Sequence, residues 1–384
     1  MAHVPTMNPR MLLVRRTASQ LLDRRVAGGP VAAVRVLLAV QAQDKAAWRL
    51  ALRARAEGIT AADVDRALTE DRSLLVVWVN RGTLHLIASE DYPWLWGLTA
   101  PTQVASNRRR LAQLEFTPDE VDRGVACIVR ALLEDGPLSR SQIRERLQTQ
   151  GIRTGGQALV HLLFATVIRG LAVMGPVARG ETLFAHTREW LGVDPGAPGS
   201  LTGKRRDIAL AELARRYLHG HGPATDGDLA KWAGLPLRDA RSGLRAVAGE
   251  LVELEGGLLD LADRKPSALE LEARWLTERL PPRLLPGFDP SQLGWRGREP
   301  FVLPAHDGLV VDKGGGFFRP MATIDGVAAA TWRVRRQGSG LEIGIDPFRP
   351  LDAGDVAALR REAEDIARFE GRTLVERVAA PAGV

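Results

Sequence analysis

The chain contains one cysteine, five lysines and two tyrosines, and only 5% of its 384 residues are aromatic. The single cysteine, Cys127, excludes an intrachain disulfide and a zinc site built from cysteines. The seven histidines show no His-Glu-x-x-His spacing, so we expect no metal site. No apolar run approaches the ~18 residues of a membrane-spanning helix, and residues 1–10 lack the apolar segment of a signal peptide. We therefore expect a cytoplasmic protein without a membrane partner.

Arginine supplies nearly all of the positive charge. The 52 Lys+Arg residues outnumber the 46 Asp+Glu residues, which gives a formal net charge of +6 and a pI near 10. A guanidinium group binds phosphate oxygens bidentately, so this composition suits a nucleic-acid partner. An arginine excess also arises from codon usage, and the charge alone does not establish such a partner.

Three successive segments follow the order of a winged helix-turn-helix, in which helices precede a β-hairpin. In residues 1–115, apolar spacing and caps predict helices at Thr17–Arg25, from Pro30, from Asp44 and at Ala61–Leu68, then strands at 74–79 and 83–87. In residues 116–196, they predict helices from Thr117, from Ser139 and at Gln157–Arg169, then strands at 171–176 and 182–186. In residues 197–264, they predict helices at Lys204–Leu218, Asp228–Ala233 and Arg238–Ala248, then strands at 251–255 and 258–262.

An internal repeat supports this division. A Gly-Pro turn, a small capping residue and a short helix recur at Gly136 and at Gly222. Recurrence of one local pattern at similar places is typical of tandem modules. The Pro- and Gly-rich stretch 194–200 separates the second segment from the third.

The last region, residues 265–384, has a different character. Short strands alternate with turns at 313–316, 325–326 and 338–340, and a helix capped by Asp352 precedes a last strand at 373–378. Residues 381–384 read as a tail. The predicted fold class is therefore α+β: three tandem winged helix-turn-helix units followed by a small antiparallel β-barrel-like domain.

Gln41 and Gln43 stand where one predicted helix ends and the next begins at the Asp44 cap. Residues two apart share a face only where the backbone is extended, so their amides can converge on one ligand if this junction is not helical. An amide offers both donors and an acceptor to such a ligand. From composition alone, the glutamines are better explained as caps or bridges between the helix ends.

Several motifs, in order along most of the chain, point to one family. They are QAQD at 41–44, RGTLH at 81–85, LLPGFD at 284–289, GGGFFRP at 314–320, DG at 325–326 and TWR at 331–333. Together they resemble the bacterial winged-helix DNA-binding proteins that include the AlkZ and YcaQ DNA glycosylases. AlkZ-type members have a Gln-apolar-Gln motif, and YcaQ-type members have Asp in its third position. Gln41-Ala42-Gln43 resembles the AlkZ type.

The resemblance implies a monofunctional DNA glycosylase, with Gln41 and Gln43 as its catalytic residues. An amide is not a strong general base, so the substrate must bring its own activation. An N7- or N3-alkylated purine is cationic and leaves as a neutral base, so two amides need only position a water and stabilise an oxocarbenium-like sugar. Bulky adducts and interstrand crosslinks are further possible substrates. We expect a monomer on double-stranded DNA, near the nucleoid, with no metal and no cofactor.

Other residues are candidates for DNA contacts. Lys45 could act as a Schiff-base nucleophile, but its place in the first turn of a helix favours a phosphate contact. The remaining candidates are Arg81, His85, Arg319, Arg333, Arg335 and Arg336.

Each of these candidates has an alternative. His85 faces either the core or the cleft, and Arg319 and Asp289 could brace the last domain as an ion pair. The basic hairpin at 333–336 could protect a sheet edge instead of binding DNA. A winged-helix regulator without catalysis, or a nucleic-acid-binding scaffold, remains the alternative function.

Overall fold

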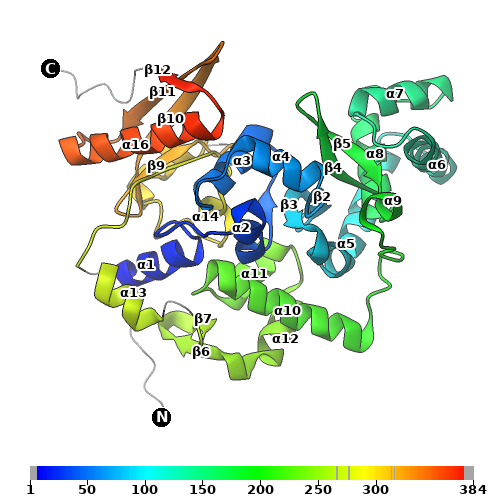
Figure 1. Cartoon of the computed structure of the whole chain (residues 1–384). Coiled ribbons are helices and arrows are strands. Elements are labelled where there is room, and N and C mark those ends of the chain that lie inside the picture. Colours follow the sequence, from blue (N-terminus) through cyan, green and yellow to red (C-terminus); the bar gives the residue numbers. More distant parts are fainter. Residues whose placement is uncertain (1–6, 265–266, 276, 313, 315, 376–384) are drawn as a thin grey trace.

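A computed structural model describes residues 7–264, 267–275, 277–312, 314 and 316–375. The fold is α+β, and its strands form two five-stranded sheets and one two-stranded sheet among many helices (Figure 1). The predicted tail at 381–384 and the end of the predicted last strand lie outside the described residues. Within them, no helix is long and apolar enough to cross a membrane.

The first helix lies earlier than the sequence predicted. Helix α1 spans Pro9–Ser19, because the Asn8 side chain accepts a hydrogen bond from the Met11 N–H and Pro9 fits the first turn. The chain then reverses at Leu21, whose φ is 55°. The predicted helix at Thr17–Arg25 is therefore wrong, since only its first residues are helical.

The next three helices begin where their caps predicted. Helix α2 (Gly29–Leu37) carries Pro30 in its first turn, and α3 (Lys45–Arg53) is capped by Asp44, which accepts from the N–H groups of residues 46 and 47. Helix α4 (Ala61–Thr69) starts with a capping box between Thr60 and Asp63. These caps fix the ends of the short segment between α2 and α3.

One sheet is shared by the first two predicted units. It contains β1 (Val40–Gln41), β2 (Leu74–Val79), β3 (Thr83–Ala88), β4 (Ala172–Ala178) and β5 (Glu181–His186) in the order β1-β3-β2-β4-β5. Strands β2 and β4 pair at Val76 and Met174, so the sheet crosses the predicted boundary at 115/116. The two hairpins therefore form one structural element.

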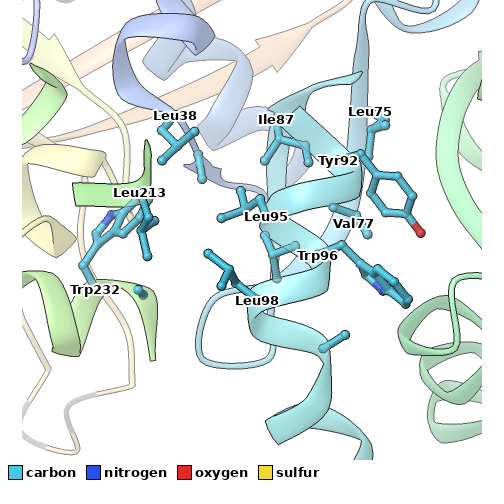
Figure 2. Packing of buried hydrophobic residues seen from close by; sticks show 14 of the residues in the cluster. Leu38, Leu75, Val77, Ile87, Tyr92, Leu95, Trp96, Leu98, Leu213 and Trp232 are labelled. Carbon is cyan, nitrogen blue, oxygen red and sulfur yellow. The ribbon is translucent and has the colours of Figure 1, made fainter. Parts of the chain in front are cut away.

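Helix α5 (Tyr92–Gln113) covers one face of this sheet. Figure 2 shows its Leu95 and Trp96 close to Val77 of β2, while Leu98 lies on the side of Leu213 and Trp232; all are in one core cluster with Leu75. All of them are buried. The opposite face of the sheet packs on α2 to α4, so the strand that carries Gln41 is fixed from both sides.

The remaining helices of the second and third segments follow the predicted order. They are α6 (Pro118–Glu134), α7 (Arg140–Thr149), α8 (Ala158–Ile168), α9 (Thr187–Leu191), α10 (Gly203–His221), α11 (Asp226–Ala233) and α12 (Leu237–Ala246). Capping boxes at Thr117, Ser139 and Thr225 start three of them. The third hairpin is β6 (Leu251–Leu254) with β7 (Leu258–Leu261), and α13 (Ala268–Trp275) follows.

The C-terminal region is an open mixed sheet, not an antiparallel barrel. Its order is β12-β11-β10-β9-β8, formed by β8 (Arg283–Leu285), β9 (Met321–Ile324), β10 (Val327–Gln337), β11 (Gly340–Pro347) and β12 (Thr373–Val375). Helix α16 (Ala353–Phe369) connects β11 to β12, and such a crossover makes that pair parallel. Among the described residues β8 and β12 remain separate edges, so closure into a barrel is not confirmed. Short helices α14 (Pro290–Leu293) and α15 (Asp307–Val310) lie between β8 and β9.

Buried arginines tie α3 to the C-terminal sheet, which lies beside it in Figure 1. Arg53 donates to Glu362 of α16 and to the Leu284 carbonyl of β8, each at 2.7 Å. Arg55 makes a two-point contact with Asp289, at 2.7 and 2.8 Å, and both side chains are fully buried. The predicted ion pair between Asp289 and Arg319 is therefore wrong, because Asp289 is buried against Arg55 and Arg319 pairs with Asp312.

Candidate active site

The segment between α2 and α3 is not helical: residues 40–41 form the short strand β1, and Gln43 lies in the bend that follows. Leu38 has a φ of 64° and ends α2, and β1 then pairs with β3 so that Gln41 lies opposite His85. The Gln41 Nε2 donates to the Gln43 Oε1 at 2.8 Å, so the two side chains meet on one side of the strand. Because Asp44 caps α3, neither glutamine is needed for that purpose.

One amide oxygen of this pair is unusual. The Oε1 of Gln41 is buried and has no hydrogen-bond partner among the described residues. A buried acceptor without a donor is unfavourable by about 1–3 kcal/mol, so such atoms commonly mark places where a water or a ligand binds. Gln41 therefore presents an acceptor, and the exposed Gln43 lies beside it.

His85 supports the strand beneath Gln41. It is only 2% exposed, and its Nδ1 lies 2.9 Å from the Thr83 carbonyl oxygen. Burial, and to a smaller extent the charge of Arg81, lowers the pKa of His85 to about 3, so the ring is neutral near pH 7. The structure places His85 in the core rather than on the surface. A neutral, buried ring in this position does not contact a DNA phosphate.

Two buried polar residues of the β2–β3 hairpin give no signal in the sequence. Thr83 lies two residues from His85 along β3 and so on the same face, and its buried Oγ1 has no partner among the described residues. Asn80 is fully buried with a φ of 32°, and both polar atoms of its side chain lack such partners. A lone threonine in a strand and an asparagine in a turn are ordinary, so no sequence signal identifies them.

The other candidates in the first two units contact the protein itself. Arg81 donates to the Trp232 carbonyl at 2.7 Å, at the end of α11, and burial lowers its pKa. Lys45 contacts the Gly180 carbonyl in the turn between β4 and β5. Burial and the neighbouring Arg49 lower the pKa of Lys45. The structure brings Lys45, but not Arg81, to the start of α3 beside the glutamines.

The C-terminal arginines differ in their partners. Arg319 pairs with Asp312 at 2.7 Å and Arg336 with Glu370 at 2.6 Å, while Arg333 pairs with Asp346 across the hairpin. Arg335 is exposed, and none of the described contacts occupies its guanidinium. Arg333 and Arg335 share one face of β10, since side chains alternate along a strand. Arg336 is on the other face.

The described residues contain no cluster of three or more His, Cys, Asp or Glu side chains that could hold a metal ion. The amide pair suits a reaction in which the leaving group carries its own activation.

Comparison with known proteins decides the family. The model of the AlkZ-like DNA glycosylases matches residues 34–369, a span that includes the glutamine pair and the C-terminal sheet. The chain belongs to the AlkZ-like DNA glycosylase family. A curated relative, the interstrand DNA cross-link repair glycosylase of Streptomyces sahachiroi, is 28% identical over 375 residues, which cover 94% of this chain and 96% of the relative.

Comparison with a solved structure supports the same relationship. The Streptomyces sahachiroi DNA glycosylase AlkZ superposes with a TM-score of 0.73 at 25% identity, over 96% of this chain and all of that one. The resemblance drawn from the ordered motifs is thus confirmed, and so is the assignment to the DNA glycosylases.

Proposed function

We propose that this DNA glycosylase hydrolyses the N-glycosidic bond of N7- or N3-alkylated purines in double-stranded DNA, with Gln41 and Gln43 as its catalytic residues. The observation that carries the proposal is the contact of the two amides, one at the end of β1 and one in the bend before α3. The family model covers this segment.

The chemistry follows from the properties of the substrate and of an amide. A purine alkylated at N7 or N3 is cationic, so breaking the bond to the sugar releases a neutral base. Positive charge then develops on the sugar, where neutral amide oxygens can stabilise it. The free acceptor of Gln41 suits the hydrogen of an attacking water. Hydrolysis by water leaves an intact abasic site, so the enzyme is monofunctional.

We infer that residues 1–115, 116–196 and 197–264 are winged-helix units and that residues 265–384 form the last domain. Lys45, Arg319, Arg333, Arg335 and Arg336 are the candidates for phosphate contacts, because each has a cationic group near the surface. Arg81 and His85 act indirectly, since they support the hairpin and strand next to Gln41. The enzyme works as a monomer on cytoplasmic DNA.

Bulky adducts, including interstrand crosslinks, are the second substrate class that we propose. The Streptomyces sahachiroi relative is named for repair of interstrand crosslinks. An adduct that joins two strands cannot enter a closed pocket for a flipped base. The partly exposed glutamine pair is compatible with such a lesion.

The deciding experiment measures base release. The protein is incubated with a duplex that carries one N7-methylguanine, and free 7-methylguanine and the abasic site are quantified. Release is expected from the wild type and much less from Gln41→Ala and Gln43→Ala, while Gln150→Ala, an exposed glutamine at the end of α7, serves as the matched control. Tight DNA binding without release would instead support a regulator.

A further inference from the structure

A pocket of about 200 Å³ opens beside the glutamine pair, between the start of α3 and the C-terminal sheet. Asp44, the residue after Gln43, lies in its wall together with Ala46 and Ala47. The opposite wall is formed by the aromatic residues Phe288, Phe317, Phe318 and Trp332, together with Val334 and Arg336. The pocket therefore begins at the residue that directly follows the proposed catalytic pair in the chain.

The aromatic wall is built from rings held in fixed orientations. Phe288 and Phe317 meet edge to face, with centroids 5.7 Å apart and planes at 89°, and Phe318 lies 5.5 Å from Phe288. Phe288 has a φ of 57°, an uncommon conformation for a bulky residue. Next to it, a Cβ on Gly287 would approach the Phe318 carbonyl oxygen to 2.4 Å, so the two segments pack backbone to backbone.

Phe317 leaves much of its ring to solvent. It is 50% exposed, although it belongs to a wall of aromatic residues. A single exposed apolar residue needs no explanation, but one that faces a preformed apolar pocket offers a surface for a planar ligand.

Several polar groups of this pocket are already engaged. The Trp332 Nε1 donates to the Leu285 carbonyl at 2.7 Å, and Arg336 is paired with Glu370. Asp44 accepts the two N–H groups of its cap. A nucleobase placed here would lose more hydrogen bonds to water than the mainly apolar wall could replace, whereas a hydrocarbon or aryl group would lose none.

We propose that this pocket binds the apolar, aromatic part of an adduct attached to the damaged base, while Gln41 and Gln43 act at the sugar. The proposal rests on the proposed glycosylase function and extends it to the class of lesion. According to this proposal, Phe317 and Phe288 favour lesions with an aromatic adduct over lesions with a small alkyl group. Both residues lie outside the glutamine motif.

Two duplexes test the proposal, one with N7-methylguanine and one with N7-benzylguanine. Both bases are cationic, and they differ by one phenyl ring. Single-turnover base release is measured over a range of protein concentrations, and the ratio of release efficiencies, benzyl over methyl, is compared. Phe317→Ala should lower this ratio at least about fivefold, mainly by raising the protein concentration at half-saturation with the benzyl substrate. Phe317→Tyr should restore it.

The matched control is Leu133→Ala on α6, because Leu133 is 52% exposed and lies outside this pocket. This variant should keep the wild-type ratio. Wild-type release with an unchanged ratio in Phe317→Ala overturns the proposal, and so does an equal loss on both duplexes, which would indicate a general role in DNA binding or folding. Failure of the wild type to release either base overturns the proposed function itself.

Discussion

At the scale of single residues, the two glutamines should differ from other polar residues in what their loss changes. Gln41→Ala and Gln43→Ala should each slow base release by more than about tenfold, because each removes about 1.4 kcal/mol or more of transition-state stabilisation. Their unfolding temperatures should stay close to that of the wild type, since Asp44 and not a glutamine caps α3. Wild-type rates in both variants would refute the site, and unfolding of both would indicate a structural role.

Lys45 bears on the class of chemistry. Its ammonium group contacts the Gly180 carbonyl, and no Schiff base enters the proposed mechanism. We therefore expect borohydride to trap no covalent protein–DNA adduct during base release, with a lyase-active glycosylase as positive control. A trapped adduct that disappears in Lys45→Ala would assign the nucleophile to Lys45.

The buried His85 predicts how stability depends on pH. Its pKa is about 3 in the folded protein, below the usual value of 6.5. Between these values the unfolded chain binds a proton that the folded protein does not, so the free energy of unfolding falls as the pH drops from 6.5 toward 3. His85→Gln should flatten this dependence by up to about 1.4 kcal/mol per pH unit in denaturant titrations. His221, with a similarly lowered pKa, should leave a residual slope of the same sign.

At the scale of elements, the β10–β11 hairpin is the sharpest test of DNA contact. Replacing Arg333, Arg335 and Arg336 by Ala should weaken binding to damaged and undamaged DNA and flatten its salt dependence. Arg335→Ala alone should lower the log–log slope by roughly one unit. The other two should contribute less, because each must first leave its carboxylate partner.

The control for the hairpin is Arg188→Ala, which removes a cation paired with Asp194 at the edge of the second unit. Binding should be measured from low to moderate salt. A triple variant with the affinity and the slope of the wild type would show that the hairpin is turned away from DNA. The charged side chains would then protect the strand edge.

Elements with strong local signals were predictable from the sequence. Caps at Thr60 and Thr117 placed two helix starts, and runs of apolar residues placed β2 and β3. The first helix was not predicted, because the apolar spacing around Leu21 and Leu22 resembles a helix while the Leu21 backbone turns the chain. Local patterns carry no information about such a reversal.

Contacts between residues far apart in the sequence could not be predicted. The open C-terminal sheet and the shared β2–β4 sheet depend on contacts between distant residues, which periodicity cannot reveal. The glutamine pair was found through its motif, but the acceptor left free on Gln41 and the Thr83 hydroxyl near it are visible only in three dimensions. The aromatic pocket likewise joins residues from 44 to 336.

At the scale of the whole molecule, the Arg55–Asp289 pair should be critical for stability. Arg55→Ala leaves a carboxylate buried without its cation, which destabilises a fold by about 3–5 kcal/mol. Chemical denaturation should detect this loss, and Arg55→Met with Asp289→Asn should recover part of it. Arg66→Ala, which breaks an exposed pair with Asp63, should change stability by less than about 1 kcal/mol. Similar losses in both single variants would refute a bracing role.

The five-stranded sheet of β1 to β5 constrains how the chain can fold during synthesis. Strand β2 can pair with β4 only after β4 has been synthesised, nearly a hundred residues later. Lys45 contacts Gly180, which follows it by 135 residues. The ion pair of Arg53 with Glu362 forms only after a further segment is synthesised, because Glu362 follows Arg53 by 309 residues. Until β4 leaves the ribosome, one edge of β2 stays unpaired and can associate with other chains. The glutamine pair therefore reaches its working geometry late, near the end of translation.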